Sequence, residues 1–206
     1  MNTQLPSTSI LCAAALTLFG CPDVENPDDP ANEQEVITTV ALTFTPDGGG
    51  AAIDAAHADP ENDGDPVIDT ITLAAGTTYA LTVKFLNELE DPPEDITVEV
   101  NEENDQHQVL VYGDGVESPA TGTNADHLVT QAYDDEDANG LPVGLKSTVD
   151  AVTAGSADFK LMLRHMPPES DTPVKVAGIA EDFATGGSAG IPGEVDADVT
   201  FPLTVE

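Results

Sequence analysis

The chain offers almost no sulfur chemistry. Its 206 residues contain two cysteines, Cys12 and Cys21, and none follows Cys21. The remainder of the chain therefore has no disulfide, no thiolate metal site and no cysteine nucleophile. Tryptophan is absent and only three tyrosines occur, so the sequence does not support the aromatic platform of a carbohydrate-binding module.

Basic residues are also scarce. Five Lys and Arg residues stand against 39 Asp and Glu residues, and the formal net charge is −34. Such a charge repels phosphate backbones and anionic surfaces, which excludes nucleic acid as a partner and favours cations or basic partners. The alternative explanation is a solubilising, salt-adapted surface, because salt screens these charges within roughly 10 Å.

Several common enzyme signatures are missing. The chain has no phosphate-binding loop, no His-Glu-x-x-His motif and no dinucleotide-binding fingerprint. Carboxylates are so numerous that no acid–base pair stands out from the sequence. We therefore expect no enzyme, and a hydrolase of unknown substrate ranks only third among the functional hypotheses.

The amino-terminal segment predicts an export signal. Residues 1–20 carry no charged side chain, and the apolar run at 10–19 is too short to span a bilayer. It ends Leu18-Phe19-Gly20-Cys21, which resembles the bacterial lipobox. We predict a lipoprotein signal peptide at 1–20 and lipidation of Cys21, with an ordinary cleaved signal or a retained helix as alternatives.

This prediction implies a location and a domain layout. Two or more acyl chains on one residue anchor a protein stably, so we expect a lipid-anchored protein of the bacterial cell envelope. The outer membrane, with the protein facing the periplasm or the cell surface, is favoured over the inner membrane. Residues 21–35 are rich in Pro and acids and predict a disordered tether, and residues 36–206 suit a single domain.

Alternation of apolar and polar residues dominates the rest of the chain. At 78–86, for example, Tyr79, Leu81, Val83 and Phe85 share one face. Similar β-branched or alternating runs and frequent turn signals predict about eight to ten short strands. They predict an all-β fold, an antiparallel immunoglobulin-like β-sandwich. On the strand at 157–165, we expect Met162 and Arg164 to face outward.

Two segments are less regular. Pro92-Pro93 followed by acids suits the start of a helix, whereas residues 96–100 alternate like a strand. Local propensity favours the strand, and one short helix near 92–106 is the alternative. Residues 167–194 are rich in Gly, Pro and small side chains and predict a long loop.

Several stretches resemble a family of uncharacterised bacterial lipoproteins. The resemblance implies an envelope location but no known activity, and in that family the segment matching 94–107 is helical. Some members carry the label of a type 1 periplasmic-binding fold, which this chain does not fit because it lacks alternating βα units. The resembling stretches are residues 32–40, 66–73, 85–88 with 95–97, 105–108, 137–145 and 163–165.

Two acidic loops have the spacing of calcium ligands. The first contains Asp135, Asp137 and Asn139 before Gly140, and the second contains Asp59, Glu61 and Asp63 before Gly64. Ca²⁺ takes six to eight oxygens, and alternating acids around a tight turn supply several. The bidentate Glu of an EF-hand is missing from both loops. The alternative for each is a turn in which Asp and Asn bond to their own backbone.

Histidines suggest a second kind of metal site. His107 opens a predicted strand and His165 ends one, so they could converge with Asp105 or Glu103 on a transition-metal ion. Arg164, the single arginine, is expected to form a structural ion pair with carboxylates. The leading hypothesis is a lipid-anchored β-sandwich with a structural or binding role, stabilised by Ca²⁺. The second hypothesis is a periplasmic lipoprotein that binds or buffers transition metals.

Overall fold

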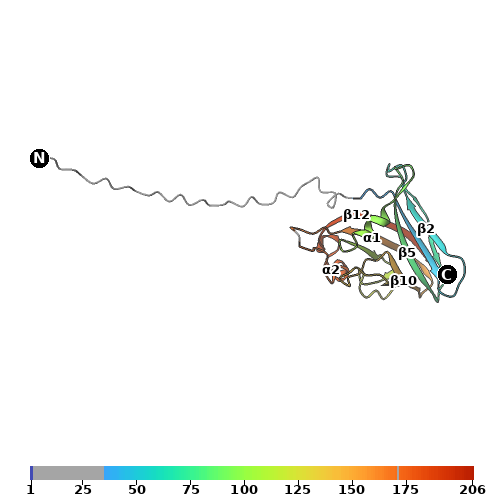
Figure 1. Cartoon of the computed structure of the whole chain (residues 1–206). Coiled ribbons are helices and arrows are strands. Elements are labelled where there is room, and N and C mark those ends of the chain that lie inside the picture. Colours follow the sequence, from blue (N-terminus) through green and yellow to red (C-terminus); the bar gives the residue numbers. More distant parts are fainter. Residues whose placement is uncertain (2–34, 171) are drawn as a thin grey trace.

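The strands of the chain form two sheets (Figure 1). The structure is a computed structural model and describes residue 1, residues 35–170 and residues 172–206. The larger sheet consists of β1 (Thr39–Pro46), β2 (Ile53–Ala58), β3 (Val67–Ile68), β5 (Thr77–Asn87), β6 (Glu94–Asp95), β8 (Val116–Glu117), β9 (Val129–Tyr133) and β10 (Lys146–Ala151). The smaller sheet consists of β4 (Ile71–Leu73), β7 (His107–Tyr112), β11 (Gly155–His165) and β12 (Glu194–Val205).

Strands that are distant in the sequence are neighbours in both sheets. The larger sheet has the order β3-β2-β1-β5-β10-β9-β8, with β6 beside β5, and the smaller has the order β4-β12-β11-β7. Neighbouring strands are antiparallel except in two short pairs, β4 with β12 and β8 with β9. The predicted all-β sandwich is confirmed. The two parallel pairs are a detail that the alternating pattern does not predict.

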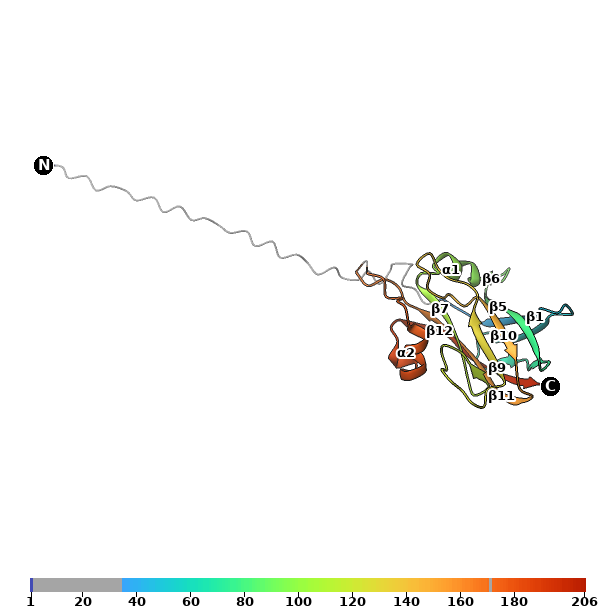
Figure 2. The ribbon, with the colours of Figure 1, turned by 90° about the horizontal axis from the view of Figure 1, so that it is seen from below.

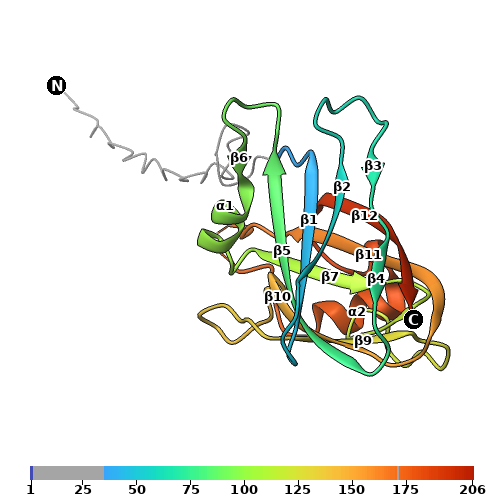
Figure 3. The ribbon, with the colours of Figure 1, turned by 90° about the vertical axis from the view of Figure 1, so that its right-hand side faces the viewer.

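The main core lies between the two sheets. The inner row of β5 is fully buried, as its alternation predicts, and it packs against inner rows of β7, β11 and β12. Phe44 of β1 makes edge-to-face contacts with Tyr79 and Phe159, which links both sheets. Figure 3 shows β1 and β5 running across β7 and β11. Side chains from both sheets therefore form one continuous core.

The segment before β7 is helical. Helix α1 (Ile96–Glu102) follows directly on β6, and the Asp95 side chain accepts a hydrogen bond from the Thr97 amide at its start. Ile96 and Val100, four residues apart, are buried against the core. The strand favoured by local propensity is wrong here, because burial at helical spacing and the Asp cap outweigh it.

The predicted loop at 167–194 contains two helices. They are α2 (Ile179–Gly186) and the short 3-10 helix η2 (Ser188–Gly190). Ile179, Ala180 and Phe183 bury one side of α2 against a second apolar cluster on the outer face of the smaller sheet. Figure 2 shows α2 beside this sheet. A structureless loop was therefore the wrong prediction for 179–190.

This helix changes the environment of β11. Met162 and Arg164, predicted to face outward, are buried at 2% and 6% exposure. Both faces of β11 are covered, one by the larger sheet and the other by α2 and its neighbours. The two-sided burial explains why alternation alone misassigned these side chains to solvent.

Three predictions from the sequence concern the amino-terminal segment. The predicted signal peptide, Cys21 and the tether up to residue 34 lie outside the described residues. Among the helices that the structure describes, none is both long and apolar enough to cross a membrane.

Candidate metal centre

Two histidines meet at one end of the core. His107 is the first residue of β7 and His165 is the last of β11, and they are directly paired across the two strands. Their rings stack at 4.4 Å between centroids, with 10° between the planes. Both are buried, at 0% and 4% exposure. The structure thus brings together the two imidazoles that the strand ends suggested.

A β-bulge adds a carboxyl to this pair. Opposite β11, Leu163 faces Ala197 but Arg164 faces Val195, which leaves Asp196 as the extra residue of β12. The Asp196 side chain has 0% exposure, and its Oδ2 lies 3.7 Å from His107 Nε2. Regular alternation would have directed it to the other face of the sheet. The bulge therefore turns an expected surface acid into the site.

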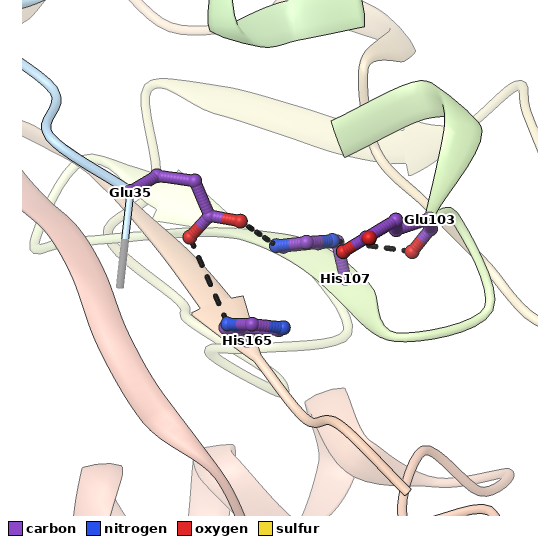
Figure 4. Close-up of side chains that lie close together, drawn as sticks. All are labelled: Glu35, Glu103, His107 and His165. Atoms are coloured by element: carbon purple, nitrogen blue, oxygen red, sulfur yellow. Dashed lines mark hydrogen bonds and ion pairs between the residues drawn. The ribbon is translucent and has the colours of Figure 1, made fainter. Parts of the chain in front are cut away.

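Glu35, which precedes β1 of the larger sheet, contacts both histidines. Its Oε1 lies 3.0 Å from His107 Nε2, and its Oε2 lies 3.7 Å from His165 Nδ1 (Figure 4). Its side chain is only 5% exposed. The predicted tether at 21–35 therefore ends too late, because Glu35 packs into the domain and touches both imidazoles.

Glu103 holds His107 from its other edge. The backbone oxygen of Glu103, at the end of α1, accepts a hydrogen bond from His107 Nδ1 at 3.1 Å. A carbonyl can only accept, so Nδ1 carries a proton. Nε2 is hydrogen-bonded to Glu35 Oε1 and would have to release its own proton to bind an ion. A carbonyl in this position is the usual support of a metal-binding histidine.

The ionisable groups of the cluster change one another's pKa values. Burial alone would raise the pKa of Glu35, but the hydrogen bond with His107 and the neighbouring Asp196 and His165 side chains outweigh it and lower that pKa to about 2. Burial and the neighbouring Glu35 carboxylate raise the pKa of Asp196 to about 9. At neutral pH, Glu35 is therefore ionised while Asp196 keeps a proton.

The remaining two ligand candidates also respond to burial. Burial, helped by the positive charge that His107 can carry, lowers the pKa of His165, so its imidazole is neutral and able to bind a metal. Burial raises the pKa of Glu103, and the charges of Glu99 and Glu35 add to this effect. A bound cation would stabilise the ionised form of both carboxylates.

Polar atoms without partners are concentrated here. Of the seven buried side-chain atoms without a hydrogen-bond partner in the described part of the chain, four belong to Glu35, His165 and Asp196. Such atoms cost free energy unless something satisfies them. Ligand atoms of Glu35, Glu103, His107 and His165 all lie within 4.8 Å of one another. A tetrahedral ion needs ligand atoms about 3.4 Å apart, so small side-chain movements would complete the site.

Asp105 does not join this cluster. Its side chain is exposed, and its charge acts on Lys175 and Glu103. The transition-metal set predicted as His107, His165 and Asp105 is therefore corrected to His107, His165, Glu35 and Glu103. Asp105 follows α1 in a turn and is exposed, whereas both histidines are buried.

The first predicted calcium loop is folded around its own backbone. Asp135 accepts hydrogen bonds from the amides of Gly144 and Lys146, and Asp137 Oδ1 accepts from those of Asn139 and Leu141. Asp137 Oδ2 lies 3.1 Å from Lys175 Nζ. The ammonium group thus stands where a cation would bind Asp137. Calcium binding by Asp135, Asp137 and Asn139 stays a prediction.

The second loop has a similar arrangement but is more exposed. The amides of Asp63 and Gly64 donate to the two carboxylate oxygens of Asp59, and the Asp65 amide donates to Asp63. Glu61 is exposed. These bonds match the self-bonded turn that was the alternative to a calcium loop, and Ca²⁺ binding at Asp59, Glu61 and Asp63 also stays a prediction.

Arg164 is not an ion-pair residue. Its guanidinium donates to the carbonyls of Pro192 and Ile191 and to the Ser188 hydroxyl at 2.7–2.9 Å. Among the residues described, no carboxylate lies within 4.0 Å of it, although the charges of Asp196 and Glu194 act on it. The predicted pair is wrong because the outer face of β11 is covered by the 188–192 segment, whose carbonyls take the donors.

A Gly-x-Ser-x-Gly match occurs at 186–190, but it does not form a nucleophile elbow. Ser188 lies in η2, after a helix, whereas the elbow joins a strand to a helix. Its Oγ accepts a hydrogen bond from Arg164. Within the described ranges, no histidine is hydrogen-bonded to it.

Comparisons with known proteins add little to this geometry. No family model matches the chain, and no curated protein matches it. The crystal structure of domains 4 and 5 of the S-layer protein SbsC is similar at 12% identity and a TM-score of 0.26. That match covers 80% of this chain and 75% of the other. At this TM-score the similarity supports no conclusion about function, and the candidate site rests on its own contacts.

Proposed function

We propose that this chain is a lipid-anchored protein of the bacterial cell envelope that binds a divalent transition-metal ion, with Zn²⁺ as the best match. His107, His165, Glu35 and Glu103 would hold the ion. The observation that carries the proposal is the buried, cross-strand histidine pair that faces a carboxylate, 4.4 Å between ring centroids. A binding role of this kind was the second hypothesis from the sequence, and the histidine geometry now favours it.

The donor atoms support this class of ion. Imidazole nitrogen suits zinc, copper and nickel, and carboxylate oxygen completes the set, whereas soft thiolate ligands are missing from the described chain. Two carboxylates balance the charge of a divalent ion. Zn²⁺ has no geometric preference of its own, so it accepts the arrangement that two strands, a helix end and Glu35 impose.

Charge and shape favour capture of a cation. The net charge of −34 raises the local concentration of cations, most strongly at low salt. A cavity of about 210 Å³ lies beside the cluster and is lined in part by Asp59, Asp196 and Asp198. Asp196 belongs both to this cavity and to the cluster. The cavity therefore offers an acidic route to the buried ligands.

Titration of chelator-treated full-length protein with Zn²⁺ tests the proposal. A ligand at 100 times its dissociation constant stabilises the folded state by about 2.7 kcal/mol, so we expect a clear rise in Tm. Ca²⁺ at the same concentration should give a much smaller rise, because it avoids imidazole. An unchanged Tm with Zn²⁺, Cu²⁺, Ni²⁺ and Mn²⁺ would contradict metal binding.

The lipid anchor has its own test. We expect Cys21→Ser to move the protein from the membrane fraction to the soluble fraction of bacterial cells, because the acylated sulfur is lost. The Tm of the domain should stay unchanged, and Cys12→Ser serves as the matched control. A Cys21→Ser protein that remained with the membrane would overturn the anchor and leave the metal site untouched.

A further inference from the structure

The strongest feature outside the metal centre is a lysine and an aspartate enclosed together. Asp137 lies in the segment between β9 and β10, and Lys175 lies in the segment between β11 and α2. The side chains of both have 0% exposure, and Lys175 Nζ is 3.1 Å from Asp137 Oδ2. Neither segment is tied to the other by a strand pairing. The two connecting segments therefore meet through these side chains and not through a β-ladder.

This contact is unusual for an ion pair. Two opposite charges without access to water lose several kcal/mol of hydration each, by order of magnitude, and need excellent hydrogen bonds in return. Yet Oδ2 is among the buried atoms with no hydrogen-bond partner, so the 3.1 Å contact lacks hydrogen-bond geometry. Lys175 instead donates to the backbone oxygen of Asn104 at 2.6 Å. The ammonium is therefore close to the carboxyl but poorly directed at its oxygen.

The other carboxyl oxygen is held by two amides. Asp137 Oδ1 accepts from the backbone N–H of Asn139 at 2.8 Å and of Leu141 at 2.9 Å. Two amide donors of this kind stabilise the negative oxygen of a tetrahedral intermediate in acyl transfer where they reach the position that this oxygen takes after attack. Burial lowers the pKa of Lys175, despite the opposing influence of Asp137, which makes the neutral amine more accessible. The pKa of Asp137 is also lowered, because the hydrogen bond from the Leu141 amide and the adjacent Lys175 ammonium outweigh burial, and this opposes protonation of its carboxyl.

We propose that Lys175 and Asp137 condense into an intramolecular amide bond that joins the 134–145 segment to the segment before α2. One proton passes from Nζ to Oδ2, which gives a neutral amine and a carboxylic acid. Nζ attacks Cγ, and the negative charge develops on Oδ1 between the amides of Asn139 and Leu141. The Cγ–Oδ2 bond then breaks, and Oδ2 leaves as water with the two protons released by the nitrogen.

The surroundings favour this reaction in two ways. The enclosed side chains are held together, which replaces a bimolecular encounter by an intramolecular one of high effective molarity. The product exchanges a buried ion pair for a neutral amide and releases water to the solvent, so the desolvation cost of two charges disappears. The bond would also supply a covalent link to a domain that has no cysteine after Cys21.

Tryptic digestion of the denatured full-length protein tests the bond. The cleavage sites at Lys84, Lys146, Arg164 and Lys175 place Asp137 in the peptide 85–146. Trypsin does not cleave after an acylated lysine, so we expect one branched product that joins 85–146 to 165–206. Its mass should be that of the two peptides less one water. Separate peptides 85–146, 165–175 and 176–206 would overturn the proposal.

A matched variant controls for incomplete digestion. Lys175→Arg keeps the positive charge but has no amine to acylate, so it should give only the separate peptides and the full mass. Because the chain is denatured before digestion, the wild-type result decides the question even if this variant folds poorly. The outcome is independent of any metal bound at His107 and His165.

Discussion

The His165→Gln variant is expected to bind Zn²⁺ at least about 10–100-fold more weakly than the wild type, since even loss of a supporting group costs that much. Glutamine resembles imidazole in size but is a much poorer ligand for zinc. The His165 imidazole lies 3.7 Å from the Glu35 carboxylate through Nδ1, and its Nε2 has no hydrogen-bond partner among the described residues. The metal-free variant should therefore melt close to the wild type.

A second histidine provides the control. His127 lies away from the cluster, with its Nδ1 against the Asn124 carbonyl. His127→Gln should leave zinc affinity unchanged when both variants are titrated against a competing chelator. If His165→Gln and His127→Gln bind equally well, the buried histidine pair is not the binding site.

Replacement of Asp196 should have the opposite effect on stability. In metal-free protein at pH 8, we expect Asp196→Asn to increase the free energy of unfolding by about 1–3 kcal/mol, the usual cost of an unsatisfied buried polar group. The pKa of Asp196 is raised to about 9 in the fold, against an ordinary value of about 4. Asparagine resembles the protonated acid in shape and is neutral at every pH. It can therefore donate to Glu35 without the free-energy cost of protonating a carboxyl at pH 8.

The sign of this effect depends on pH. A raised pKa contributes stability that is fully present below about pH 4 and is lost as pH rises toward 9. The advantage of Asp196→Asn should therefore be absent near pH 4 and grow up to about pH 9. Glu35, whose pKa is lowered to about 2, changes stability only as pH falls from about 4.5 toward 2, outside most of this window.

Denaturant unfolding across this pH range measures the prediction. Asp158→Asn, which removes an exposed carboxylate from β11, is the control and should change stability little at any pH. A variant Asp196→Asn that is less stable than the wild type at pH 8 would show that the buried carboxyl is stabilising when ionised. That result would contradict a protonated Asp196 carboxyl at this pH.

The strands could be predicted because one of their faces is buried. In β5 and in most of β12, alternation directs every second residue into the core, and the structure keeps that pattern. Alternation failed on β11, where Met162 and Arg164 are buried by α2. A second covered face leaves no polar row, and the sequence pattern cannot show which distant segment covers it.

The two α-helices were harder to predict for a similar reason. Ile96-Thr97-Val98-Glu99-Val100 has strong strand propensity, and only tertiary burial of Ile96 and Val100 makes a helix preferable. Helix α2 lies between glycines, with Gly178 before it and Gly187 after it. Its three buried side chains are too few to give a strong pattern in a segment rich in small residues.

Three of the four candidate ligands could be named from the sequence. His107 and His165 could be proposed because both stand at strand ends, and a simple cross-strand pairing then places them together. Glu103 was one of the two carboxylates expected beside them. Asp196 could not be proposed, because a register shift at Arg164 is required to turn it inward. Glu35 could not be proposed, because it follows an acidic, Pro-rich stretch whose composition predicts a tether. Only the folded domain distinguishes it from the acidic residues before it.

The spacing of the acidic loops has two structural explanations. The spacing of Asp135, Asp137 and Asn139 matches calcium ligation, but the same spacing lets each carboxylate bond to nearby amides. The cation beside Asp137 is Lys175, which is 38 positions later in the chain and could not be paired with it from sequence alone. Local spacing therefore identified the anionic groups without identifying what they contact.

X-ray absorption at the zinc edge of the Zn²⁺-loaded full-length protein tests the metal centre most directly. We predict four nitrogen or oxygen neighbours at about 2.0–2.2 Å and the multiple-scattering signature of two imidazoles. The His165→Gln protein should lose one of these imidazoles. A spectrum with oxygen neighbours only, in the wild type, would place the ion on surface carboxylates and contradict a site at His107 and His165.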